Sequence, residues 1–187
     1  MELELLGKHI LVAGLRSAPV EDPGALIERL RAREELSNVV FQLLDARLVA
    51  GREHLLISAL NAIRAMELGL NVSSDLGIEI LTFASGQRQI SKAIRLMGLK
   101  PGLTEVAVVL VADSREELET ALNALAEELR GRRDDDVLLV DEGKAERLIE
   151  AFGLGHEELS ACSRLGDRPE AVKALVLEKV ALSVAYR

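Results

Sequence analysis

The sequence predicts an α+β fold: a single domain over residues 1–187, with a mixed, largely antiparallel sheet and a three-helix subdomain packed beside it. Two observations favour this fold class. The length and the 49% hydrophobic fraction suit one well-packed globular domain. The apolar runs typical of strands and the three- to four-residue periodicities typical of helices follow one another without the regular alternation of a parallel α/β fold.

The first fifty residues predict two strands with a helix between them. HILVAGL (9–15) is a short apolar run of the strand type. The Asp22-Pro23 pair supplies a cap and a first-turn proline for a helix that continues to about Leu36. A second strand is expected over residues 38–50, with a break near Asp45.

Three helices joined by short capped turns are expected over residues 53–98, which form the helical subdomain. On the first helix, apolar residues recur on one face, at Leu56, Ala59, Leu60, Ile63 and Met66. Gly69 and Asn71 are typical of its C-terminal end. Ser73 or Ser74 is expected to cap the second helix, and the third helix is expected from about residue 87 to residue 97.

The remaining residues predict two more strands and three more helices. TEVAVVLVAD (104–113) has the clearest strand pattern, and Ser114 with Glu117 forms a capping-box pattern for the helix that follows. GRRDDD (131–136) is expected to be a polar loop and VLLVD (137–141) a short strand. A helix broken by Gly153 and Gly155 and a final helix from Pro169 complete the chain.

Composition and charge exclude several classes of protein. No apolar run approaches the roughly 18 residues of a membrane span, and the N-terminal order of acidic before apolar residues is wrong for a signal peptide. Together with the single cysteine, Cys162, these features predict a cytoplasmic protein that does not enter a membrane. A net charge of -8 disfavours a general nucleic-acid binder, and 2% aromatic residues leave few rings on which bases stack.

Neither an active site nor a metal site is recognisable in the sequence. His9, His54 and His156 lie in different predicted elements, and no phosphate-binding loop or nucleophile elbow is present. The acidic run Asp134–Asp136 has the pattern of a solvated turn. We therefore expect no enzymatic activity, no catalytic residue, no metal and no cofactor.

One window of the acidic chain is basic. ASGQRQISKAIRLMGLK (84–100) holds four basic residues and no acidic one. On a helix that turns 100° per residue, Arg88, Lys92 and Arg95 form one basic stripe. The residues expected on the opposite, buried side are Ile90, Ala93, Ile94 and Met97. This pattern fits a small site for a few phosphates, and it also fits an ordinary surface helix.

The same region resembles the kinase-binding subunit of the KEOPS complex, whose eukaryotic counterpart is the PRPK-binding protein. The resemblance covers HLLISALNAIRAMELGLNVSSDLGIEILTFASGQRQISKAIRLMGLK (54–100). It is carried by the Ala-Ile-Arg-Ala helix centre, the Gly-x-Asn-x-Ser turn, the Asp-Leu-Gly-x-Glu-Ile-Leu helix and the Arg-Gln-Ile and Ser-Lys-Ala-Ile series. It is strong over residues 54–112, plausible at the C-terminal end and weak over the first 50 residues, and the archaeal members are the most similar.

The resemblance implies a non-catalytic subunit of a complex that makes N6-threonylcarbamoyladenosine in tRNA. Such a subunit binds and regulates the atypical kinase of the complex, and through it reaches the threonylcarbamoyl transferase subunit. The archaeal members also capture the single-stranded 3′ CCA end of tRNA. The family motif places that end at Arg88, Gln89 and Ile90, and helical geometry adds Lys92, Arg95 and Lys100. Gly86, Asn71 and Ser74, in the flanking turns, complete the expected tRNA-binding set.

The kinase-binding surface is less well defined by the sequence. A stripe on the final helix, Leu175, Val176 and Val180, is a candidate, although such a stripe is more often core. Two alternatives remain at this point. One is a protein–protein adaptor that regulates the kinase without contacting RNA, and the other is a small metabolite-binding enzyme domain.

Overall fold

The computed structural model describes residues 2–5, 7–162 and 167–183. The chain divides into two compact units, Met1–Ala46 with Gly98–Val137 and Arg47–Met97 with Leu138–Arg187. The first unit holds an antiparallel sheet with two α-helices, and the described residues of the second form helices joined by turns, without a strand. The α+β fold class predicted from the sequence is confirmed.

The sheet of the first unit has the strand order β1-β2-β4-β3. Its strands are β1 (Glu2–Leu5), β2 (Lys8–Arg16), β3 (Val40–Asp45) and β4 (Glu105–Ala112), with the short β5 (Arg132–Arg133) paired to the end of β2. Every pairing among the described strands is antiparallel, so the expectation of a mixed sheet was wrong. The predicted strands at 9–15 and 104–113 are confirmed as β2 and β4.

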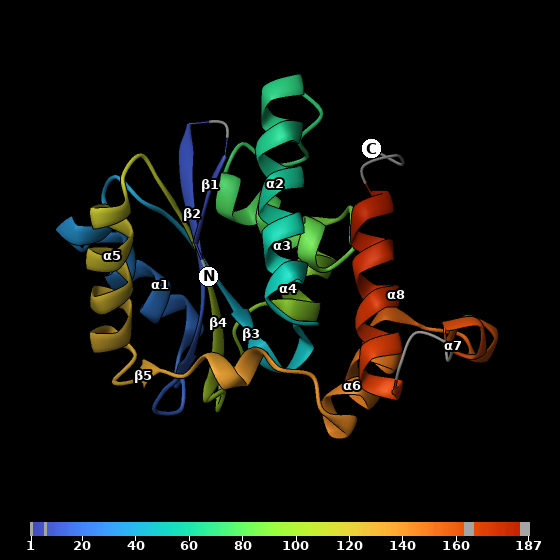
Figure 1. Ribbon diagram of the computed structural model, residues 1–187. Helices are drawn as coiled ribbons and strands as arrows, with labels where there is room; N and C mark the ends of the chain where they lie inside the picture. Colours follow the sequence, from blue (N-terminus) through green and yellow to red (C-terminus); the bar gives the residue numbers. More distant parts are fainter. Residues whose placement is uncertain (1, 6, 163–166, 184–187) are drawn as a thin grey trace. The chain divides into compact units, whose positions relative to one another are not determined.

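Helices α1 (Pro23–Arg31) and α5 (Arg115–Glu128) lie on one side of this sheet (Figure 1). Alternate residues of β2 and β4 pack with the apolar sides of both helices in one core. Asp22 caps α1 by accepting hydrogen bonds from Gly24 and Ala25, and Ser114 and Glu117 form the predicted capping box of α5. Helix α1 ends earlier than predicted, and a separate turn of 3₁₀ helix, η1 (Glu34–Leu36), follows.

The second unit contains six α-helices in its described residues. They are α2 (Arg52–Leu68), α3 (Leu76–Ala84), α4 (Ile90–Met97), α6 (Glu142–Phe152), α7 (His156–Cys162) and α8 (Arg168–Leu182). The three helices predicted for residues 53–98 are therefore present, and the second unit adds the last three. Gly69 and Gly153 end α2 and α6 in left-handed conformations, as expected of glycine at these positions.

Three local predictions were wrong. Asp75, not Ser73 or Ser74, caps α3, and its carboxylate accepts a hydrogen bond from the Ile78 N–H. The run VLLVD is not a strand, because its first two residues end the 3₁₀ helix η3 (Asp135–Leu138). The preceding GRRDDD segment is structured rather than a solvated loop: Arg132 and Arg133 form β5, and Asp135 accepts a hydrogen bond from the Gly14 N–H at 2.9 Å.

A second 3₁₀ helix, η2 (Ala46–Leu48), follows β3 at the break expected near Asp45. No helix in the described ranges combines the length and the apolar character that crossing a bilayer requires.

Candidate functional site

The turn between α3 and α4 ends one helix and begins the next within five residues. The N–H of Gln87 donates to the carbonyl of Thr82 at 3.1 Å, and that of Gly86 donates to the carbonyl of Phe83 at 3.0 Å. Gly86 has a φ of +63°, the left-handed conformation that this helix-ending motif requires. Arg88 and Gln89 therefore precede α4 rather than forming its first turn, and the predicted helix start at residue 87 was wrong.

The basic side chains of this segment are directed to solvent. Arg88 in the turn, and Lys92 and Arg95 on α4, are all exposed, and the last two lie three residues apart on one helix face. Among the residues that the structure describes, no hydrogen bond or ion pair involves any of these three side chains. Three positive charges in an acidic protein are thus left available to an external anion.

Fewer apolar residues of α4 are buried than the sequence predicts. Ala93 and Met97 are buried, whereas Ile90 is half-buried and Ile94 is 47% exposed. Because residues four apart lie on the same side of a helix, Ile90 and Ile94 form a partly exposed apolar ledge. Ser91 lies between this ledge and the basic pair Lys92 and Arg95, at 100° per residue. The expectation that Ile90 and Ile94 would be core residues was wrong.

The turn before α3 is held from inside by a carboxylate. Glu79 is fully buried, and one of its oxygens accepts hydrogen bonds from the N–H groups of Val72 (3.1 Å) and Ser73 (3.0 Å). Asn71 is half-buried and its side-chain amide donates to the carbonyl of Ser73, while Ser74 is exposed. The turn that the sequence analysis assigned to the tRNA site is thereby fixed in shape.

The far end of α3 is anchored by His54 of α2. The imidazole is fully buried; its Nδ1 accepts a hydrogen bond from the Ala50 N–H, so Nε2 carries the proton and donates to the carbonyl of Ala84 at 2.8 Å. Burial lowers the pKa of His54 to about 4, which keeps the ring neutral. The ring of Phe152 packs edge-on against it, with centroids 5.8 Å apart.

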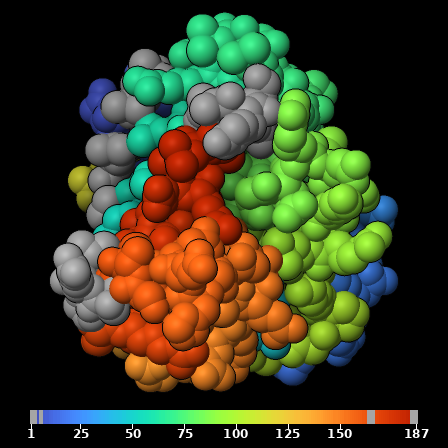
Figure 2. Space-filling model, turned by 90° about the vertical axis from the view of Figure 1, so that its right-hand side faces the viewer, coloured from blue at the N-terminus to red at the C-terminus, as the bar shows by residue number. Residues whose placement is uncertain are grey.

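The space-filling view places this segment on the surface of the second unit. In Figure 2 the light-green atoms of the stretch that contains α4 form an open surface and are not covered by the red and orange helices α6–α8. The side chain of Phe83, by contrast, is fully buried and is not available to a ligand.

Lys100 does not belong with the other basic residues. It lies in the first unit, where its ammonium group is 3.6 Å from a carboxylate oxygen of Asp45, a residue that is only 1% exposed. Its charge is therefore already paired with Asp45, and the structure does not support the expectation that Lys100 joins the basic stripe.

The stripe proposed for kinase contact is part of a core. Leu175, Val176 and Val180 are at most 5% exposed and belong to one apolar cluster with residues of α6. The structure therefore supports the alternative that this stripe is core, and these side chains are not accessible to a partner protein. Within the described ranges, no three His, Cys, Asp or Glu side chains gather in a way that would hold a metal ion.

Sequence reasoning missed the two buried polar groups, Glu79 and His54, that shape the site from within. Glu79 had a signal, since it is the one charged residue in LGIEILTFA, an otherwise apolar helix. A lone carboxylate in such a segment is expected to be buried with hydrogen-bond partners. His54 had no comparable signal in the sequence.

Comparison with known proteins gives two findings. Residues 18–183 match the model of a family described as kinase binding protein CGI-121. A curated protein of Methanocaldococcus jannaschii, Regulatory protein Cgi121, is 34% identical over 158 residues, which cover 83% of this chain and 92% of that relative. The match therefore extends over both compact units.

Proposed function

Because the chain belongs to the CGI-121 family of kinase-binding proteins, we propose that it is a non-catalytic regulatory subunit of the KEOPS complex. In this role it binds the atypical kinase of the complex and, through the kinase, is linked to the threonylcarbamoyl transferase subunit. It also captures the single-stranded 3′ CCA end of tRNA. The proposal places the protein in the cytoplasm, where tRNA is modified.

One observation carries the RNA-binding part of the proposal. Arg88, Lys92 and Arg95 are exposed and without side-chain partners in the described residues, although the protein has a net charge of -8. Three positive side chains close together on an acidic protein favour a local anion-binding site, and they do not favour nucleic-acid binding over the whole surface. Their number suits the few phosphates of a short single strand.

The residues beside these charges suit the bases of that strand. Single-stranded RNA ends are recognised by contacts to unstacked bases as well as by phosphate contacts. The ledge of Ile90 and Ile94 offers apolar contact, and the guanidinium plane of Arg88 offers stacking in place of an aromatic ring. Gln89 is exposed and supplies amide donors and acceptors. In this proposal the turn at Gly86 and the turn that contains Asn71 and Ser74 flank the RNA end.

The test is binding of tRNA with and without its CCA end, across a salt series. We expect Arg88→Glu to weaken the binding of intact tRNA and to leave the weaker binding of trimmed tRNA unchanged. For the parent protein, log K should fall against log salt concentration with a slope of about -0.7 per phosphate contacted. The matched control is Arg64→Glu, which reverses an exposed arginine on α2 outside the site.

A second candidate function, an adaptor that regulates the kinase without contacting RNA, has its own supporting observation. Leu68, Leu70 and Val72, around the end of α2, are 70%, 47% and 39% exposed, and apolar side chains of this kind suit a protein partner. The two functions differ in the Arg88→Glu variant. Unchanged tRNA binding together with normal kinase stimulation would favour the adaptor and contradict the RNA site.

A further inference from the structure

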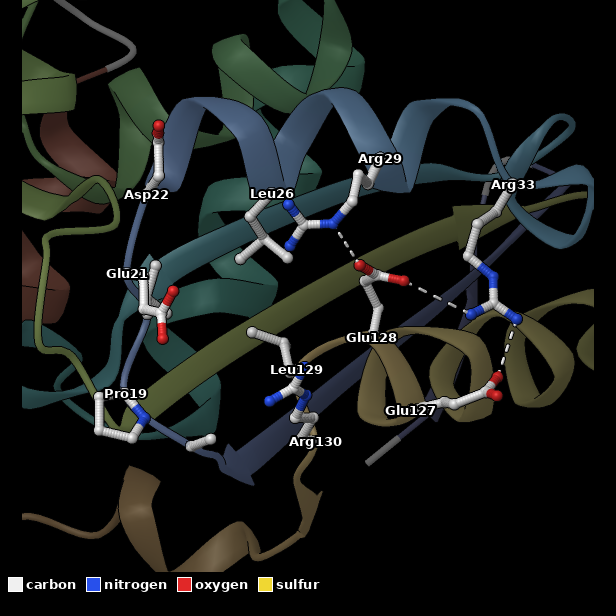
Figure 3. A pocket seen from close by; sticks show the side chains of 12 residues that line it. Pro19, Glu21, Asp22, Leu26, Arg29, Arg33, Glu127, Glu128, Leu129 and Arg130 are labelled. Atoms are coloured by element: carbon white, nitrogen blue, oxygen red, sulfur yellow. Dashed lines mark hydrogen bonds and ion pairs between the residues drawn. The ribbon is translucent and has the colours of Figure 1, made fainter.

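A cavity of about 490 Å³ lies in the first unit, far along the chain from the basic segment of α4. Its lining comes from the strand-to-helix connection at residues 18–22, from α1, from Arg33 just after α1, and from residues 127–130 at the end of α5 (Figure 3). Its size falls within the range of small-molecule sites. Neither the family match nor the function proposed above uses it.

Ion pairs hold the right-hand wall of the cavity in Figure 3 in place. Arg33 contacts Glu127 at 2.8 Å and Glu128 at 3.8 Å, and Arg29 donates through Nε to Glu128 at 2.6 Å. Arg29 has no other side-chain partner among the described residues, so its two terminal nitrogens remain available. In Figure 3 these nitrogens point over Leu26, toward the open space.

Arg130 adds a second guanidinium group at a conformational cost. Its φ is +48°, and no other described residue except glycine has a positive φ. Arg130 occupies the left-handed position just after α5. The N–H of Gly131 donates to the carbonyl of Ala126 at 2.8 Å, which completes the helix-ending motif in which glycine is usual at the Arg130 position. Arg130 lines the cavity and has no side-chain partner in the described residues. Backbone strain at such a position points to a functional role for the arginine side chain.

The opposite side of the cavity carries a negative charge. Glu21 lies across from Arg29 and Arg130 in Figure 3 and has no hydrogen-bond or ion-pair partner in the described part of the chain. Between the two sides, the lining includes the apolar side chains of Val20, Leu26 and Leu129, each only 4% exposed. The cavity thus presents available donors, an available acceptor and an apolar surface between them.

The charge balance decides what kind of ligand fits. Arg29, Arg33 and Arg130 supply three positive charges, and the four lining carboxylates are Glu21, Asp22, Glu127 and Glu128. A phosphate or another multivalent anion would meet a net negative wall, and a simple cation would leave two guanidinium groups unused. We propose that the cavity binds a small zwitterion, an amino acid or dipeptide with an aliphatic side chain. Arg29 and Arg130 hold its carboxylate and Glu21 its ammonium group.

The first experiment measures binding to the full chain by calorimetry or by NMR shifts of the residue 18–33 and 126–131 amides. The probes are L-leucine and the dipeptide leucylglycine, which differ in the separation of their two charges. N-acetylleucine lacks the ammonium group and leucinamide lacks the carboxylate. We expect one of the two zwitterions to bind, and each truncated probe to bind about tenfold more weakly or worse, since each loses one charged hydrogen-bond set. No binding of either zwitterion, or tighter binding of inorganic phosphate, would overturn the proposal.

The second experiment uses Arg130→Gly, which separates binding from folding. Glycine is favoured at this left-handed position, so the melting temperature should be unchanged or higher, while zwitterion affinity falls about tenfold or more. Glu21→Gln should weaken leucine but not N-acetylleucine. Arg88→Glu is the cross-control and should leave the cavity unaffected. An Arg130→Gly protein that binds the zwitterion as well as the parent, or that melts at a lower temperature, would contradict the proposed role of Arg130.

Discussion

The buried carboxylate of Glu79 lies 3.0 Å from the main-chain nitrogen of Ser73 and accepts its hydrogen bond. The same oxygen accepts a second bond from Val72, so one side chain of α3 determines the path of the turn before that helix. A site built on this turn therefore depends on a residue that contacts no ligand.

Replacing Glu79 with glutamine should loosen the turn without emptying the space that the side chain fills. A neutral amide oxygen is a weaker acceptor than a carboxylate, and we expect a loss of about 1–3 kcal/mol in the free energy of unfolding. The main-chain amides of Val72 and Ser73 should also exchange with deuterium faster than in the parent. The control is Glu67→Gln on the exposed surface of α2, which should change neither quantity.

The neutral, buried His54 predicts a dependence of stability on pH. Its pKa is about 4 in the folded protein and 6.5 in the unfolded chain, so the unfolded state takes up the proton first as the pH falls. The stabilisation is complete above pH 6.5 and is lost progressively as the pH falls to about 4. The shift corresponds to roughly 3 kcal/mol. Urea unfolding at several pH values measures this dependence.

A His54→Gln variant removes the titration and should have a flatter stability profile between pH 6.5 and 4. Replacement of His156, which is exposed, is the matched control and should leave the slope as in the parent. A slope that persists in His54→Gln would assign the pH dependence to other groups.

Local sequence signals predicted the elements whose causes are local. The capping box of Ser114 and Glu117, the cap at Asp22 and the glycine ends of α2 and α6 depend on residues a few positions apart, and all are present. The strand prediction for residues 137–141 failed for the opposite reason. Asp134 and Asp135 are held by Arg16 and Gly14, more than a hundred residues earlier, and these bonds fold the segment into β5 and η3.

The candidate site was also predicted only in part from the sequence. The basic residues and their exposure followed from the charge pattern, but which apolar residues of α4 are covered depends on the helices around it. A helical wheel places Ile94 with Ala93 and Met97, yet Ile94 is exposed. The partner of Lys100, Asp45, lies 55 positions away and has no local signal.

Gly14 is predicted to be intolerant of a side chain. A Cβ at this position would lie 2.5 Å from the carbonyl oxygen of Asp134 and 2.5 Å from a methyl group of Val137, closer than real Cβ contacts. The Gly14 N–H donates to the Asp135 carboxylate and the Gly14 carbonyl accepts from the Asp134 N–H, so the glycine is bound to the same segment and that segment has to move. We expect Gly14→Ala to lower the free energy of unfolding by about 1–3 kcal/mol. Gly143→Ala, in the open first turn of α6, is the control and should be neutral or stabilising.

Lys92 and Lys100 are predicted to have opposite effects when each is changed to alanine. Lys100 pairs with the buried carboxylate of Asp45, and its loss should cost about 1–3 kcal/mol of folding free energy, with little effect on tRNA affinity. Lys92 is exposed and pairs with no described side chain, so its loss should leave the stability within about 0.5 kcal/mol of the parent. The same variant should weaken tRNA binding and reduce the salt slope by about 0.7. Urea unfolding and tRNA titrations of both variants measure these effects. If Lys100→Ala weakened tRNA binding while Lys92→Ala did not, the RNA-contacting surface would lie in the first unit instead of on α4.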